Sequence, residues 1–76
     1  MTLIELVADV LQESPANVTD ATSRKTHRRW DSFNHVQLMV RVEDEYGVKL
    51  SNAEIEGLSS VSEVRALLKQ KGVASL

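Results

Sequence analysis

Three short motifs that cap helix N-termini divide the chain and restrict what it can fold into. Thr2 and Glu5 form a T-x-x-E capping box, and S-x-x-E boxes follow at Ser51–Glu54 and Ser60–Glu63. In such a box each side chain accepts a hydrogen bond from the other residue's backbone N–H, which satisfies donors that the first turn leaves unpaired. Apolar residues at helical spacing follow each box, and no segment alternates as a strand would. We therefore predict an all-α fold.

The pattern predicts a four-helix bundle with three main helices and a short third helix, in a single domain covering residues 1–76. Asp31 is a good N-cap for the second helix, and Gly47 suits a left-handed C-terminal cap. The predicted helices run from Thr2 to Ser14-Pro15, from Asp31 to Gly47, from Ser51 to Gly57 and from Ser60 to Gly72. The third helix has only one or two turns and few apolar residues to anchor it. We therefore expect that this helix can move.

The second predicted helix is expected to bury one apolar stripe. Its members are Phe33, Val36, Met39, Val40 and Val42, widened by Leu38 and closed by Tyr46. The connection before it, residues 14–30, is rich in Ser, Thr and Asn, with Val18 and Ala21 as its only candidate core anchors. Connections of this length are usually functional or mobile.

Charges around the second helix oppose its dipole. Arg28 and Arg29 precede the positive end, and residues 43–45 (Glu-Asp-Glu) crowd the negative end. Arg41 is placed to offset part of this through an i,i+4 pair with Glu45. The charges at both ends of this helix are thus opposite to those that would stabilise it. This suggests selection for something other than stability. Solvated surface charge is the competing interpretation.

Size and composition exclude several classes of protein. A chain of 76 residues is poorly suited to a deep catalytic pocket, so we expect no enzymatic activity of its own. The absence of cysteine fits a reducing compartment. No apolar run reaches membrane-spanning length, and acidic residues interrupt the first apolar segment where a signal peptide would be apolar. We expect a cytoplasmic monomer that does not insert into membranes.

Ser32 follows Asp31 at the mouth of the second predicted helix. An anionic group held there would be stabilised by free backbone N–H groups and by the helix dipole. We interpret Ser32 as a point for permanent attachment of a phosphate-bearing group. His35 lies one turn away, which could suggest that Ser32 is a catalytic nucleophile. A catalytic triad also needs an oriented base, a buried carboxylate and an oxyanion hole, and an exposed helix start supplies none of these.

Two other binding interpretations are weaker. His27 and His35 lie eight positions apart without a cysteine or a suitably spaced carboxylate, which matches no closed metal site. The segment from Arg24 to Trp30 superficially resembles a nucleic-acid patch. Because loop charges in a protein of net charge −2 more often face solvent or another protein, we expect no nucleic-acid partner. Trp30 is expected to be half-buried.

The run WDSFNHVQLMVRVEDEYGVKLSNAEIEGLSSVSEVRALL resembles the acyl carrier protein family, and the resemblance covers nearly the whole chain. It includes Asp-Ser and a bulky apolar residue opening the second helix, and the acidic–aromatic–Gly ending at residues 43–47. The resemblance implies a 4′-phosphopantetheine arm attached to Ser32 by a phosphopantetheinyl transferase, with an acyl cargo held as a thioester. It also implies that Asp31 helps the transferase hold its magnesium.

Departures from the family pattern suggest a specialised carrier serving a dedicated lipid, polyketide-like or acyl-transfer pathway. Arg29-Trp30 replaces the small pair usual before Asp-Ser, and Asn34 and Gln37 stand where fatty-acid carriers tend to have acids. The acyl-loading and acyl-transferring enzymes are expected to contact the basic loop (residues 24–29) and Trp30, Phe33, His35, Arg41, Glu43 and Asp44. The alternatives are an aminoacyl or peptidyl carrier and an unmodified helical interaction module.

Overall fold

A computed structural model describes residues 1–76 as four α-helices and one short 3-10 turn. The helices are α1 (Leu3–Leu11), α2 (Ser32–Tyr46), α3 (Asn52–Gly57) and α4 (Val61–Gln70), and the turn η1 (Pro15–Asn17) follows α1. The predicted all-α fold, with three main helices and a short third one, is confirmed. None of the helices combines the length and the apolar character needed to cross a membrane.

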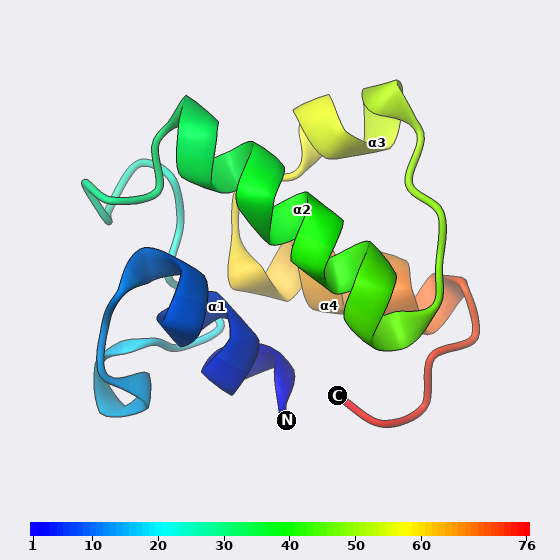
Figure 1. Cartoon of the computed structure of the whole chain (residues 1–76), viewed down its shortest axis with the longest axis horizontal. Helices are drawn as coiled ribbons and strands as arrows, with labels where there is room; N and C mark the ends of the chain where they lie inside the picture. The colour runs from blue at the N-terminus through cyan, green and yellow to red at the C-terminus, as the bar shows by residue number, and fades with distance from the viewer.

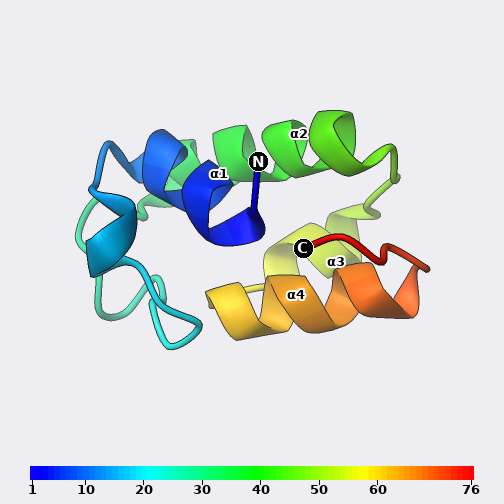
Figure 2. The same ribbon diagram turned by 90° about the horizontal axis from the view of Figure 1, so that it is seen from below.

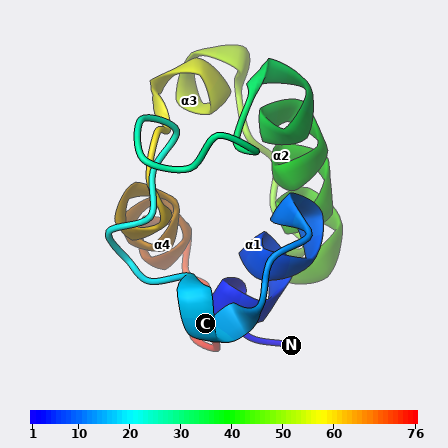
Figure 3. The same cartoon turned by 90° about the vertical axis from the view of Figure 1, so that its left-hand side faces the viewer.

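The helices surround a core to which all three main helices contribute. α2 crosses the molecule with α1 beside it (Figure 1). α4 lies on the side opposite α2 (Figure 2), and α3 lies at the edge between them (Figure 3). The fifteen core residues are Leu3, Leu6, Val7, Ala8, Leu11, Val18, Trp30, Leu38, Met39, Val42, Leu50, Leu58, Val61, Val64 and Leu68. α3 supplies none of them, and its Ile55 is only partly buried against the core.

Helix caps follow the predicted pattern with one exception. The boxes at Thr2 and at Ser51 both have the reciprocal pair of hydrogen bonds. At α4, Ser60 accepts from the N–H of Glu63, but the Glu63 carboxylate accepts from the N–H and hydroxyl of Ser59 instead of from Ser60. The third box is therefore shifted by one residue on its return bond, although the helix begins where the motif predicts.

The prediction for the buried face of α2 is wrong for three of its residues. Phe33, Val36 and Val40 are 71%, 57% and 50% exposed. The buried stripe is instead His35, Leu38, Met39 and Val42, which are spaced i, i+3, i+4 and i+7. One of the four buried residues is a histidine. A search of the sequence for apolar residues alone therefore does not find the complete stripe.

The connection between α1 and α2 is pinned to α4 along much of its length. Val18 is buried as predicted, but Ala21 is exposed and Thr22 takes the inner position. The carbonyl of Thr22 accepts from the N–H of Val61 (3.0 Å), and the N–H of Arg24 donates to the carbonyl of Ser59 (2.9 Å). These bonds hold a long connection, whose only regular element is the short turn η1, against the start of α4.

A second anchor joins the connection to the end of α1. The Glu13 carboxylate accepts from the Asn17 side-chain amide and the Ser14 N–H, and its other oxygen lies 3.1 Å from His27 Nε2. The hydrogen bond from Asn17, followed by those from His27 and Ser14, lowers the pKa of Glu13 from 4.5 to about 2. The ionised carboxylate is thus the form that holds the loop.

Replacing Glu13 with Gln should lower the free energy of unfolding at neutral pH. A carboxyl whose pKa is lower in the folded state contributes stability above its unfolded pKa of 4.5, and this contribution disappears as the pH falls towards the folded value of about 2. The stability difference between the native protein and Glu13→Gln should therefore shrink over that interval in urea titrations followed by Trp30 fluorescence. Glu56→Gln, at an exposed side chain without a hydrogen bond, is the control and should show no such trend. A difference independent of pH would contradict the assignment.

Candidate functional site

Ser32 is the first residue of α2 and is exposed. The Asp31 carboxylate before it caps the helix by accepting from the N–H of Asn34 at 2.8 Å. No protein group hydrogen-bonds the Ser32 hydroxyl, and the backbone N–H groups of Ser32 and Phe33 have no acceptor in the protein. An accessible hydroxyl therefore stands beside two free donors at the positive end of a fifteen-residue helix.

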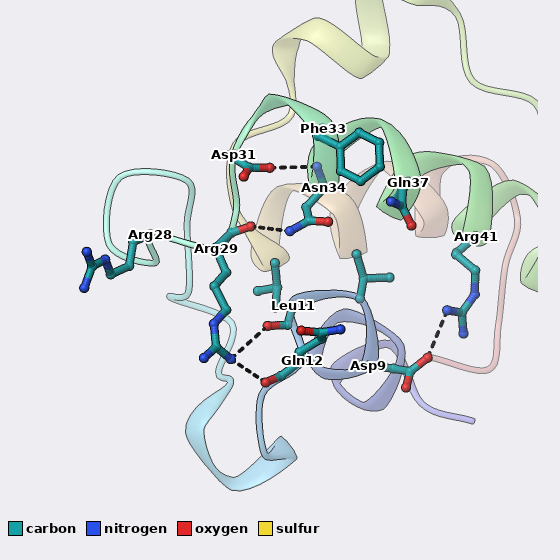
Figure 4. A pocket seen from close by; sticks show the side chains of 11 residues that line it. Asp9, Leu11, Gln12, Arg28, Arg29, Asp31, Phe33, Asn34, Gln37 and Arg41 are labelled. Carbon is teal, nitrogen blue, oxygen red and sulfur yellow. Dashed lines mark hydrogen bonds and ion pairs between the residues drawn. The ribbon is translucent and has the colours of Figure 1, made fainter.

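A clamp formed by Arg29 and Asn34 holds the chain just before this serine. The Asn34 side chain donates to the carbonyl of Arg29 at 2.7 Å. The Arg29 guanidinium in turn donates to the carbonyls of Gln12 (2.5 Å) and Leu11 (3.4 Å), which α1 leaves unpaired at its C-terminus (Figure 4). The start of α2 is thereby tied to the end of α1.

A buried hydrogen-bonded chain lies beneath the same segment. The indole N–H of Trp30 donates to Nδ1 of His35 at 2.9 Å, and Nε2 of His35 lies 2.7 Å from the carbonyl oxygen of Ile55 in α3. Because an indole N–H only donates, Nδ1 must accept, so the proton of the neutral imidazole is on Nε2 and is donated to Ile55. His35 thus joins the loop before Ser32, α2 and α3.

Neither histidine is positioned to activate Ser32. Both ring nitrogens of His35 are engaged by Trp30 and Ile55, and the side chain is 4% exposed. His27 lies against Glu13 at the end of α1. The hydroxyl therefore has no general base among its neighbours, and the geometry is that of a displayed group rather than of an activated nucleophile.

A groove of about 540 Å³ lies between α1 and α2 beside the start of α2. Asp31, Phe33, Asn34, Gln37 and Arg41 line it from the α2 side, and Arg28 and Arg29 from the loop. Asp9, Val10, Leu11 and Gln12 line it from α1 (Figure 4). Arg41 is half-buried there and pairs with Asp9 at 2.9 Å, so the predicted pair with Glu45 is wrong.

The expected docking residues divide into three groups. Phe33 and Asp44 are exposed, whereas Glu43 is half-buried and accepts from the N–H of Leu50 at 2.8 Å. Trp30 is 2% exposed rather than half-buried, and His35 is 4% exposed, so neither side chain presents a surface to a partner. Large amphipathic side chains next to a helix start often lie on the surface. Here the indole nitrogen of Trp30 and both ring nitrogens of His35 have hydrogen-bond partners inside the protein.

The sequence gives no signal for the clamp that Arg29 forms. Its guanidinium meets the carbonyls of residues that lie 17 and 18 positions earlier in the chain. α1 ends at Gln12, whose backbone is left-handed (φ 54°), and the carbonyls of Leu11 and Gln12 accept hydrogen bonds from the loop only because the fold brings Arg29 to them. A cation near a helix C-terminus is favourable, but this one comes from a distant segment.

Comparison with known proteins agrees with this geometry. The model of the family described as "Phosphopantetheine attachment site" matches residues 2–68. The chain belongs to this phosphopantetheine-binding family of carriers. It is an acyl carrier protein, and members of the family act as carriers without catalysing a reaction themselves.

Its relatives include both specialised and general acyl carriers. Over 69 residues it is 41% identical to polyketide-8 synthase acyl carrier protein 2 of Streptomyces avermitilis, covering 91% of this chain and 79% of that protein. It is 32% identical to the meromycolate extension acyl carrier protein of Mycolicibacterium aurum, covering 90% and 70% respectively. It is also 32% identical to an acyl carrier protein of Thermosynechococcus vestitus, covering 91% and 85%.

The start of α2 in this acyl carrier protein has the chemistry that a phosphodiester needs. A phosphodiester has anionic oxygens that accept hydrogen bonds, and the two unpaired N–H groups and the helix dipole favour such an anion. The guanidinium of Arg28, exposed and without a protein partner, adds positive charge on the groove side. The residues present therefore fit the prosthetic group of the family.

Breaking the Trp30–His35 hydrogen bond should destabilise the carrier. Trp30→Phe leaves Nδ1 of His35 without a donor, and His35→Leu leaves the indole N–H without an acceptor. Each change should lower the free energy of unfolding by about 1–3 kcal/mol, because a buried polar atom loses its partner. The double variant should lose less than the sum of the two, by about 0.5–3 kcal/mol.

Circular dichroism is the appropriate measurement for this cycle, because Trp30 is the only tryptophan and its loss removes the fluorescence signal. Urea titrations of the native protein, both single variants and the double variant complete it. Strictly additive losses would show that the two side chains do not stabilise one another.

Proposed function

We propose that Ser32 is the residue that carries the 4′-phosphopantetheine arm of this acyl carrier protein. The observation that carries the proposal is the exposed, unpaired hydroxyl at the first position of α2, beside two unpaired backbone N–H groups. The arm supplies a thiol that holds an acyl group as a thioester. The protein itself supplies a fixed tether and a charge environment suited to the phosphodiester.

Asp31 has two roles in this proposal. Its carboxylate caps α2 by accepting from Asn34, and it is exposed next to Ser32. A carboxylate oxygen is also a preferred magnesium ligand, and Mg²⁺ commonly binds phosphates together with one or two carboxylates. We therefore assign Asp31 to the magnesium site of the phosphopantetheinyl transferase complex.

The pathway proposed for this carrier is a dedicated lipid, polyketide-like or acyl-transfer pathway. The most informative relatives are named for polyketide synthesis and meromycolate extension. The exposed face of α2 also supports specialisation, because it has Gln37 where an acid is usual in fatty-acid carriers. A partner surface that selects acidic carriers would gain little Coulomb attraction from this part of the helix.

The proposed docking surface is the exposed face of α2, defined by Phe33, Val36 and Val40. Their spacing places all three on one side of the helix that begins with Ser32. Asp44 lies further along the same side. Exposed apolar residues that gather on one face are typical of a surface that another protein covers. Trp30 and His35 support this surface from below rather than contacting the partner.

Mass spectrometry tests the attachment directly. Incubation of the apo protein with coenzyme A, Mg²⁺ and a broad-specificity phosphopantetheinyl transferase should add one arm, and Ser32→Ala should gain none. Ser62→Ala, at an exposed serine in the first turn of α4, is the matched control and should be modified like the native protein.

Asp31→Asn separates the two roles of that side chain. Asn caps helices about as well as Asp, so folding should be retained while the magnesium ligand is weakened. This variant should need more Mg²⁺ for the same rate of modification.

Two outcomes of the mass measurement would contradict the attachment at Ser32. They are an arm on the Ser32→Ala protein, and a folded native protein that never gains an arm.

Truncating Phe33 tests the docking surface. Phe33→Ala removes a side chain that is 71% exposed, so the free energy of unfolding should change by no more than about 0.5 kcal/mol. The KM of the transferase for the apo carrier should rise roughly five- to tenfold, which corresponds to about 1–1.4 kcal/mol of lost apolar contact. Lys69→Ala, which shortens an exposed side chain on α4, should leave KM unchanged. An equal KM for Phe33→Ala and the native protein would exclude this surface.

A further inference from the structure

We infer that the groove between α1 and α2 binds oxygen-bearing acyl chains carried on Ser32, in preference to unsubstituted alkyl chains. This inference rests on the proposed attachment at Ser32 and goes beyond it by naming a class of cargo and the residues that recognise it. The groove begins at Asp31 and Phe33, on either side of the serine in sequence, and continues along α2 to Arg41 (Figure 4).

Arginines stand at both ends of the groove. Arg29 closes the end nearest the loop, where one guanidinium nitrogen donates to the carbonyls of Leu11 and Gln12. Arg41 closes the other end, where one guanidinium nitrogen donates to Asp9. In each case only one of the three guanidinium nitrogens has a protein acceptor, so each arginine keeps further N–H donors for a ligand.

Uncommitted amide groups line the space between these arginines. The side chains of Gln12 and Gln37 lie on opposite walls, from α1 and α2, and neither has a hydrogen bond to the protein. Only three of the eleven lining residues are hydrophobic: Val10, Leu11 and Phe33. The groove thus combines a small apolar surface with many donors, and its two carboxylates, Asp9 and Asp31, already accept from Arg41 and from the N–H of Asn34. This lining fits a chain that has carbonyl or carboxylate oxygens.

Desolvation decides between the two classes of cargo. An alkyl chain in the groove would displace the water that is hydrogen-bonded to the amide and guanidinium groups. The chain cannot accept hydrogen bonds in place of that water, so its binding is unfavourable. Carbonyl or carboxylate oxygens would accept from the same groups, and a bond to a charged donor is the stronger kind. The second hollow of the protein lies on α4, lined by Glu63, Ala66, Leu67, Lys69 and Gln70, so it is not an alternative beside Ser32.

The groove has a length that cargo on Ser32 can use. Arg41 lies nine positions after Ser32, and at a rise of about 1.5 Å per residue this spans about 13–14 Å of helix. An arm equivalent to about five extended residues reaches about 17 Å. The arm is therefore longer than this stretch of helix, and when it is not fully extended it can bring its cargo level with Gln37 and Arg41.

Three arms with five-carbon acyl groups test the inference by side-chain NMR. Ser32 is loaded with amide-linked pentanoyl, 4-oxopentanoyl or glutaryl arms, and intact mass confirms each product. The 4-oxopentanoyl and glutaryl arms should shift the side-chain amide signals of Gln12 and Gln37 and the Nε–H signal of Arg41, relative to the pentanoyl arm. Signals from Gln70, an exposed amide on α4, should stay in place and serve as an internal reference.

Variants identify which side chains cause the effect. In Arg41→Gln, the oxygen-bearing arms should shift the signals of Gln12 and Gln37 less than they do in the native protein. Folding should be retained, because a surface ion pair contributes only about 0–1 kcal/mol. Arg65→Gln is the matched control, since Arg65 also pairs with a carboxylate, Asp20, but lies on α4. This control should leave the shifts unchanged.

The outcomes separate the inference from the proposal beneath it. A loaded protein whose groove signals are the same with all three arms overturns the inference and leaves the attachment at Ser32 intact. Larger shifts with pentanoyl than with 4-oxopentanoyl also overturn it. Failure of Ser32 to accept any arm contradicts the attachment, and the inference falls with it.

Discussion

The hydrogen-bonded chain from Trp30 through His35 to Ile55 is the interaction on which the presentation of Ser32 depends. It brings a loop, a main helix and a short helix to one buried point, and every bond in it has a defined donor and acceptor. In a low-dielectric interior such a chain rigidifies its surroundings only when each member is satisfied. α3 has no fully buried residue, so it is held by the bond from His35, by the packing of Ile55 against the core and by the ion pair of Glu54 with Lys71 at 3.2 Å.

A second set of contacts turns this buried support into an exposed tether. Asn34 and Arg29 fasten the segment before Ser32 to the open C-terminal carbonyls of α1, while Asp31 caps α2. Arg29 and Asp31 satisfy backbone groups that helix ends would leave unpaired, and Asn34 holds the carbonyl of Arg29 in the loop. The hydroxyl of Ser32 and the neighbouring N–H groups are what remains free. The carrier function needs this combination, because a covalent arm requires an accessible oxygen on a rigid support.

The α2 helix carries two apolar stripes with different uses. Leu38, Met39 and Val42 face the core together with His35, whereas Phe33, Val36 and Val40 face outwards. A helix with both stripes cannot bury them both in a bundle of this size, so one remains as surface. That surface and the polar groove between α1 and α2 lie on adjoining sides of the helix that begins at Ser32. Partner contact and cargo contact thus use adjoining sides of one helix, and Phe33 borders both of them.

The sequence alone determined the all-α fold, the order and starting points of the helices and the position of Ser32 at the start of α2, because capping boxes and apolar spacing are local signals. The end of α1 was not determined in this way, since the helix stops at Leu11 instead of continuing to Ser14-Pro15. Only the tertiary structure decided which stripe of α2 is buried, that Trp30 and His35 are internal, and that Arg41 pairs with Asp9 rather than with Glu45. The reason is that these contacts join residues from different elements. A side chain's partner across the fold depends on how helices pack, and helical periodicity does not encode that packing.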